Sequence, residues 1–238
     1  MHYISIVSTI ISFIFAGAVF YRYKQRGGIH LLFWGIGLLF YGVGTLMEAI
    51  MLFTFAPLAL KLWYLTGAML TAAWLGQGTV NLLVRKRNIT RLLNAILLGV
   101  SLLALVLVLF APVDTAAAQS YNLNQPASEQ YQAILGRSGL TVLLTILLNI
   151  YGTITLVGGA IYSAFLFWRK KVLLNRMLGN ILIAAGALMP AMAGSFVRAG
   201  LVDWLYLSEF IGVVLMYSGF LLATATQPLK SSTPAVAG

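Results

Sequence analysis

Long apolar runs separated by short polar connectors dominate the sequence. Seven of these runs approach or exceed the ~20 apolar residues that a helix needs to cross the hydrocarbon core of a bilayer. They are Tyr3–Tyr21, Leu31–Phe53, Leu58–Val84, Leu92–Phe110, Leu140–Trp168, Leu178–Val197 and Trp204–Ala225. The pattern predicts an all-α membrane protein with seven transmembrane helices, so the two termini are expected on opposite sides of the membrane.

Basic residues set the expected orientation. The connectors after the first, third and fifth runs, together with the tail, hold 12 of the 15 basic residues. These 12 are Arg22, Lys24, Arg26, Arg85, Lys86, Arg87, Arg91, Arg169, Lys170, Lys171, Arg176 and Lys230. The other side keeps Lys61, Arg137 and Arg198. Because basic residues mark the cytoplasmic side, we expect the N-terminus outside and the C-terminus inside.

Composition narrows the class of protein. With 61% hydrophobic residues, 8% charged residues and a mean hydropathy of +0.94, the chain has no room for a separate soluble domain. The net charge of +10 lies in short connectors, where attraction to an anionic inner leaflet explains it better than nucleic-acid binding does. We therefore expect a multi-pass protein of a cell membrane, such as a bacterial or archaeal inner membrane, with no nucleic-acid partner.

A short motif recurs at a nearly constant offset. Gly44–Ala49 is echoed 142 residues later by Gly186–Ala191, and Leu60–Trp63 is echoed 141 residues later by Leu201–Trp204. The recurrence predicts two parallel three-helix repeats, unless it is a coincidence of common apolar residues. The expected seven-helix domain covers 1–226, with repeat A at about 3–84, a linker helix at about 92–110, an outer loop at 111–137 and repeat B at about 140–225. Residues 227–238 are expected to form a disordered cytoplasmic tail.

This three-plus-one-plus-three plan resembles that of the sugar-exporting SWEET proteins and, more loosely, that of rhodopsin-like seven-helix proteins. The Pro-Gln pair of the SWEET repeat is absent from the predicted spans, because Gln125-Pro126 and Gln227-Pro228 are reversed and lie in a loop and the tail. A rhodopsin holds retinal on a lysine in its last helix, and Trp204–Ala225 contains no lysine. The plan is also similar to the seven-helix sensor modules of some bacterial histidine kinases. The resemblance is one of architecture and implies no retinal cofactor.

Two acidic residues fall inside predicted spans. Glu48 and Glu209 each lie about a turn or two from the outer boundary, where an ionisable group is costly unless it faces the bundle interior or water. Helical spacing places Tyr41 on the face of Glu48 and Tyr206 on the face of Glu209. We therefore expect an outward-facing polar pocket whose ligand-binding residues are Glu48, Glu209, Tyr41, Tyr206, Trp63, Arg198, Lys61 and Asn149.

Each of these residues also has a structural interpretation. Ion pairs of Glu48 with Lys61 or of Glu209 with Arg198 would lower the cost of each charge, and such pairs equally suit a role in tying helix ends together. Asn149 lies near the middle of its helix, among amides and hydroxyls that either join helices by hydrogen bonds or line a polar path.

Two further features bear on the pocket. Residues 111–137 form the longest connector, which is expected to cover the pocket as a lid or to be slack, with a short helix starting near Ser128. Pro190 occupies the repeat position that matches Glu48 and is expected to break the hydrogen-bond ladder of its helix, either as a kink that opens the pocket or as a tolerated membrane proline.

The chemistry of the chain favours binding over catalysis. The sequence has no cysteine, and its two histidines, His2 and His30, lie near span ends on opposite sides, so neither a metal nor a haem cofactor is expected. No nucleophile stands beside a base, and we expect no enzyme, with an intramembrane hydrolase as the one exception. The leading hypothesis is a protein that binds and translocates a small solute or ion. The alternative is a receptor-like sensor or accessory membrane subunit that acts through a membrane or cytoplasmic protein partner.

Overall fold

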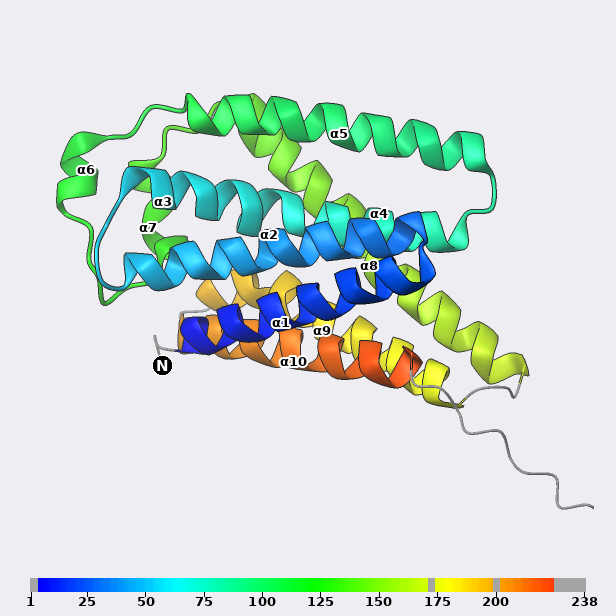
Figure 1. Ribbon diagram of the computed structural model, residues 1–238. Helices are drawn as coiled ribbons and strands as arrows, with labels where there is room; N and C mark the ends of the chain where they lie inside the picture. Colours follow the sequence, from blue (N-terminus) through cyan, green and yellow to red (C-terminus); the bar gives the residue numbers. More distant parts are fainter. Residues whose placement is uncertain (1–3, 171–173, 199–201, 225–238) are drawn as a thin grey trace, which may run out of the picture.

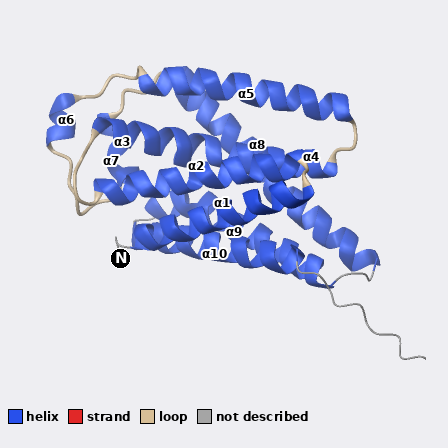
Figure 2. Ribbon diagram, viewed as in Figure 1, coloured by secondary structure: helices blue, strands red, loops and turns tan. Residues whose placement is uncertain are grey.

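The protein is built from helices. The computed structural model describes residues 4–170, 174–198 and 202–224, and within these ranges extended segments pair only in an isolated bridge between Val113 and Leu135 (Figure 2). The elements are α1 Ile4–Arg26, α2 Ile29–Met51, α3 Pro57–Leu62, the π-helix η1 Trp63–Leu70, α4 Thr71–Leu83, α5 Arg87–Leu109, α6 Thr115–Gln119, α7 Ala127–Ile134, α8 Gly139–Lys170, α9 Leu174–Arg198 and α10 Val202–Thr224. The predicted tail at 227–238 lies outside the described residues.

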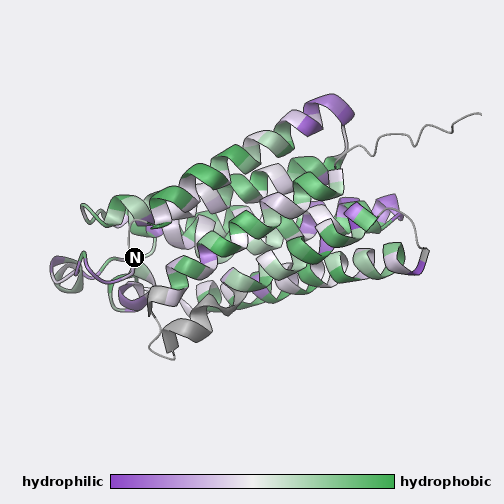
Figure 3. Cartoon of the chain, turned by 90° about the horizontal axis from the view of Figure 1, so that it is seen from below, coloured by the Kyte–Doolittle hydropathy of each residue, from purple (hydrophilic) through white to green (hydrophobic). Residues whose placement is uncertain are grey.

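Six of the described helical segments are long and apolar enough to cross a membrane. They are Ile4–Arg26, Ile29–Met51, Pro57–Leu83, Arg87–Leu109, Gly139–Arg169 and Trp204–Thr224. Each overlaps one of the predicted runs, and hydrophobic residues cover most of the helix surfaces (Figure 3). The sixth predicted run, Leu178–Val197, falls within α9, a 25-residue helix that is not among these six. The fold is therefore that of an all-α protein with the helices of a multi-pass membrane protein.

The long helices form a closed ring. Helix α1 packs on α2, α2 on η1 and α4, α4 on α8, α8 on α9, α9 on α10, and α10 back on α1 (Figure 1). Helix α5 lies outside this ring against α4, η1 and α8. Because only 17% of the apolar window of α5 is buried, most of its surface is free to face lipid. We call the end of the bundle that carries α6 and α7 the outer end.

Glycines bring neighbouring helices into close contact. On α9 and α10, Gly186 lies opposite Gly212, and a Cβ atom on Gly186 would stand 2.6 Å from the carbonyl oxygen of Gly212. Gly179 and Gly219 repeat this arrangement two turns away. Between α4 and α8, a Cβ atom on Gly152 would overlap the backbone of Ala72. Small residues allow such close backbone packing in membranes, where burial from water does not drive helices together.

The outer segment is folded rather than slack. Residues 111–137 contain α6 and α7, and the latter starts at Ala127, one residue before the predicted helix start. The side chain of Gln130 bonds to the backbone of Asn122 in both directions, at 2.8 and 2.9 Å, and Ile134 and Leu135 are buried in the core beside η1 and α5. Helix α9 continues through Pro190, whose missing N–H removes one bond from the ladder without ending the helix. The outer segment thus packs on the ring.

Candidate functional site: an acidic cavity between the helices

A large cavity occupies the outer half of the ring. Its volume is about 520 Å³, and side chains of α2, η1, α4, α7, α8, α9 and α10 line it. Five of the predicted site residues belong to its wall: Glu48, Glu209, Tyr41, Trp63 and Asn149. A space of this size matches the 300–1,000 Å³ of typical small-molecule sites. Distant parts of the chain therefore meet around one compartment.

Glu48 and Glu209 face each other in this wall. Glu48, near the end of α2, is only 2% exposed, and Glu209 on α10 is partly buried. The two carboxyl groups lie close enough to interact, and ionising both is unfavourable because like charges repel at short range. Oε1 of Glu48 and Oε2 of Glu209 are buried and receive no hydrogen bond from a donor group in the described part of the chain. The acid pair therefore has no basic partner among the described residues that line the cavity.

Two tyrosines flank the acid pair in different ways. The hydroxyl of Tyr41 donates a 3.0 Å hydrogen bond to the backbone carbonyl oxygen of Glu209, which links α2 to α10. Tyr206 is fully buried beside Leu205 and Ile4 and does not belong to the cavity wall. Only Tyr41 of these two is therefore placed to contact a ligand directly.

The π-helix η1 supplies another part of the wall. Its wide turns displace backbone groups from regular bonding, and the amide of Asn149 on α8 donates 2.8 Å hydrogen bonds to the carbonyl oxygens of Ala68 and of Thr145. The hydroxyl of Tyr64 shares a 2.8 Å hydrogen bond with Thr145. Single-turn π segments occur frequently at functional sites, where they present side chains that a regular helix would direct elsewhere. Here η1 presents Trp63 to the cavity.

The two basic residues expected to pair with the glutamates, Lys61 and Arg198, are not found in ion pairs with them among the described side chains. The ammonium group of Lys61 donates a 2.8 Å hydrogen bond to the carbonyl oxygen of Leu109 at the end of α5, away from Glu48. The predicted pair of Glu48 with Lys61 therefore does not form. Helix α9 ends at Arg198, whose side chain lies outside the described side chains, so the expected pair with Glu209 falls there too.

Sequence reasoning missed one pair of residues at the outer end. The guanidinium of Arg137 lies 4.7 Å from the ring centroid of Tyr131 and 5.7 Å from that of Tyr64, at cation–π distance. Both rings line the cavity. Tyr131 belongs to α7, which the sequence predicted only as a short helix in the connector. In the sequence, the available signal for this contact was an aromatic residue, Tyr131, close to a basic one, Arg137.

Outside the spans, the pKa of one tyrosine depends on the charge of Glu48. Tyr121 lies in the outer segment between α6 and α7, with its ring centroid 4.6 Å from that of Phe55. Burial, and then the negative charge of Glu48, raise the pKa of Tyr121 to about 12. The electrostatic influence of Glu48 therefore reaches the segment that covers the outer end.

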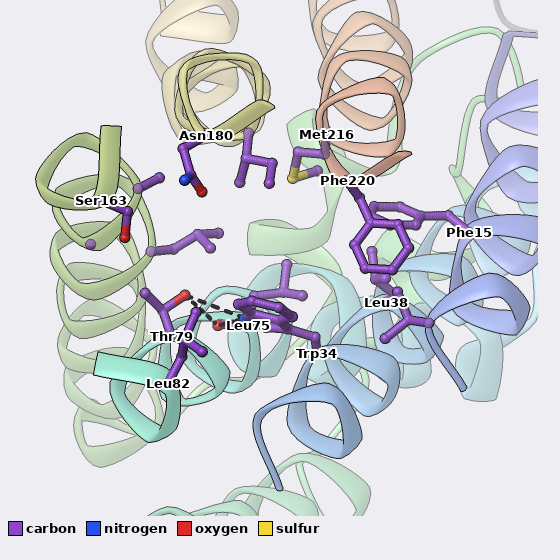
Figure 4. A pocket seen from close by; sticks show the side chains of 15 residues that line it. Phe15, Trp34, Leu38, Leu75, Thr79, Leu82, Ser163, Asn180, Met216 and Phe220 are labelled. Atoms are coloured by element: carbon purple, nitrogen blue, oxygen red, sulfur yellow. Dashed lines mark hydrogen bonds between the residues drawn. The ribbon is translucent and has the colours of Figure 1, made fainter. Parts of the chain in front are cut away.

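A second, smaller cavity continues toward the other end of the ring. Its volume is about 60 Å³, and Thr79, Ser163 and Asn180 contribute polar groups to an otherwise apolar wall (Figure 4). The indole of Trp34 donates to the carbonyl oxygen of Leu75 at 3.1 Å and to the hydroxyl of Thr79 at 3.3 Å. Three residues line both cavities: Leu75, Leu156 and Met216. They form an apolar boundary that the two compartments share.

The fold and these cavities define an all-helical protein with the spans of a multi-pass membrane protein. Neither a scan against protein-family models nor searches of curated proteins and solved structures found a match to the chain. Among the residues that the structure describes, no group of three or more His, Asp or Glu side chains is arranged to hold a metal ion.

Proposed function

We propose that the chain spans a cell membrane seven times, binds a small solute or ion in the outer cavity and translocates it. The N-terminus would lie outside and the C-terminus inside, as the distribution of basic residues favours. The observation that carries this proposal is the pair Glu48 and Glu209, two ionisable groups facing one cavity at membrane depth. Ionisable side chains in such positions are costly, and they mark substrate and ion pathways in membrane proteins.

The second cavity supports translocation. A route that runs from the outer cavity past Leu75, Leu156 and Met216 into the inner cavity would cover most of the bundle's length. An apolar constriction between two compartments can gate by excluding water. Such a gate fits alternating access, in which one half of the bundle moves against the other.

The packing order supports the two-repeat arrangement. In the ring, α1, α2 and α4 follow one another, as do α8, α9 and α10, and the two junctions α4–α8 and α10–α1 occupy equivalent positions. Leu75 and Met216 are 141 residues apart, as are Phe15 and Leu156, and this equals the offset of the sequence motif. These four residues all line the inner cavity. Leu75 and Met216, which line both cavities, would thus occupy equivalent positions of two repeats.

A receptor-like sensor is the second candidate. The observation that favours it is the small inner cavity, about 60 Å³ against about 520 Å³, which leaves the outer cavity without a wide exit. In that case the outer cavity would bind a signal, and the basic connectors would engage a membrane or cytoplasmic partner.

Flux measurements separate the two candidates. The protein is reconstituted into liposomes and challenged with a panel of radiolabelled amines, sugars, amino acids and inorganic ions, while a dye reports the internal pH. We expect uptake of at least one class, lost in Glu48→Gln and Glu209→Gln. The matched control is Glu129→Gln, an exposed glutamate on α7 that does not line the cavity. Binding of a panel compound without any flux would favour the sensor.

A further inference from the structure

Several hydroxyl groups in the wall of the outer cavity direct their protons into the protein, whereas that of Tyr131 only accepts hydrogen bonds and keeps its proton available. Thr71 and Thr145 donate to backbone carbonyl oxygens four or five residues earlier, at 2.7 and 2.8 Å, and Tyr41 donates to the carbonyl oxygen of Glu209 at 3.0 Å. Because Thr145 uses its proton in this way, the hydroxyl of Tyr64 is the donor in the bond between them. Four potential donors are thus unavailable to a ligand.

Acceptor atoms remain. Both N–H groups of the Asn149 amide are used by carbonyl oxygens, and its Oδ1 receives no hydrogen bond from the described residues. Oε1 of Glu48 and Oε2 of Glu209 likewise receive none from a donor group in that part of the chain. Buried acceptors are normally satisfied, so a ligand that brings several N–H donors would complete this wall.

Charge points in the same direction. No basic side chain is among the described residues that line the cavity, whereas two carboxyl groups are. The surrounding elements contribute Tyr41 from α2, Tyr206 from α10, Tyr121 and Glu129 from the outer segment and, behind the rings of Tyr131 and Tyr64, Arg137. Two carboxylates at this depth are costly unless a cation or a proton neutralises them.

Aromatic rings complete the wall. Trp63 and Tyr131 meet edge to face with their centroids 5.4 Å apart, and Tyr64 lies 5.5 Å from Tyr131. Tyrosine and tryptophan rings attract cations through their quadrupoles, as Arg137 already shows on the two tyrosines. A cavity that combines carboxyl groups with such rings suits an organic cation, and among the described residues no group of three or more His, Asp or Glu side chains is placed to hold a metal ion instead.

We infer that the outer cavity binds a small organic ammonium ion, a protonated amine, between the acid pair Glu48–Glu209 and the ring of Trp63. The cation replaces a proton on the acid pair, so one positive charge enters and one proton leaves. The charge of the cavity is then unchanged, and the bound state keeps both carboxylates paired. This inference rests on the proposed function, since it names the ligand class and the exchange partner for the same cavity.

Binding is tested with three compounds of nearly the same shape. The purified protein in detergent is titrated with phenethylammonium, with neutral 2-phenylethanol and with anionic phenylacetate, and its Tm is recorded at pH 7.5 and 5.5. We expect only the cation to raise the Tm, and more so at pH 7.5, because protons compete for the same carboxyl groups. In a weakly buffered solution its binding should release about one proton per cation. Stabilisation by phenylacetate or 2-phenylethanol, or by none of the three, would overturn the inference.

Single-residue variants test whether the cation binds at the assigned residues. Glu48→Gln and Glu209→Gln preserve shape, so they are expected to fold, and both should abolish the cation-dependent rise in Tm, whereas Glu129→Gln should retain it. Trp63→Leu should weaken the apparent affinity about 2- to 30-fold, the range expected for losing a cation–π contact. A response that survives in both glutamine variants contradicts the site.

The inference and the proposed function fail separately. Cation binding that depends on the acid pair, without any uptake of label or change of internal pH in proteoliposomes, supports the ligand class and removes translocation. Uptake of a neutral or anionic solute, without any effect of phenethylammonium, keeps translocation and overturns the ligand class.

Discussion

The hydroxyl of Tyr41 on α2 donates a 3.0 Å hydrogen bond to the backbone carbonyl oxygen of Glu209 on α10. These residues lie 168 positions apart, and both line the outer cavity. The bond therefore holds the backbone beside one carboxyl group to the helix that carries the other. It also joins the helices assigned to the two proposed repeats.

Removing this bond should destabilise the protein modestly. Tyr41→Phe keeps the ring and loses the hydrogen bond, so we expect the free energy of unfolding to fall by about 1 kcal/mol. The measurement is thermal unfolding in detergent. Tyr21→Phe, on a ring that is 65% exposed, is the matched control and should leave Tm unchanged. Equal Tm values for the two variants would contradict a structural role of the bond.

The contact between α4 and α8 should tolerate no side chain at Gly152. A Cβ atom there would overlap the backbone of Ala72, so Gly152→Ala forces the helices apart. Overpacking of this kind costs about 1–3 kcal/mol. Gly158 lies on the same helix with open space within 4 Å of the position its Cβ atom would take, so Gly158→Ala is the control. Denaturation in a detergent series compares the two, and a Gly152→Ala variant as stable as Gly158→Ala would refute the close approach.

Widening the apolar constriction should open a leak. Leu156→Ala removes one of the three side chains that separate the cavities. We expect faster passive proton entry into proteoliposomes, reported by a pH-sensitive dye, because a wider constriction wets more readily. The same variant should lose about 2–5 kcal/mol of stability. Leu143→Ala, on a side chain of α8 that is 51% exposed, should leave the leak rate at its original value. Equal rates for the two variants would argue against a gate at Leu156.

Titration of Tyr121 should report on the charge of Glu48. Burial and this charge raise the pKa of Tyr121 from 10.0 to about 12. In Glu48→Gln the negative charge is absent, so the pKa of Tyr121 should fall. Ultraviolet difference titration measures it, with Tyr121→Phe identifying the signal. An unchanged value would show that Glu48 does not influence the outer segment.

The same shift has a defined consequence for stability. Because the folded state raises the pKa of Tyr121, it holds this proton more tightly than the unfolded chain does. The stability that this raised pKa adds to the folded state is fully present below about pH 10 and is lost as the pH rises through about 12. Tyr121→Phe should therefore flatten the decline in Tm over this interval.

Local patterns predicted much of the fold. Six of the predicted spans coincide with apolar helices, and the short helix near Ser128 forms as α7 from Ala127. Helix α9 continues through Pro190, because a proline removes only its own hydrogen bond from the ladder and neighbouring helix contacts can maintain the rest. The π-helix η1 was not predicted, since nothing in the local sequence distinguishes its wide turns from a regular helix.

The candidate site was predicted in part. Glu48, Glu209, Tyr41, Trp63 and Asn149 meet at one cavity, because spacing along each helix determines which side chains share a face. Tyr206 and Lys61 make other contacts instead. The rotation of a helix about its axis depends on packing against neighbouring helices, which the sequence of that helix alone does not determine.

By itself, the sequence determined the helices, because in lipid each span must satisfy its own backbone hydrogen bonds and its apolar length is a local property. The tertiary structure alone decided that Glu48 meets Glu209, 161 positions away, and that Asn149 bonds to the carbonyl oxygen of Ala68. Such meetings follow from how glycine contacts and side-chain shapes set the distance and rotation between helices, and these depend on many distant residues at once.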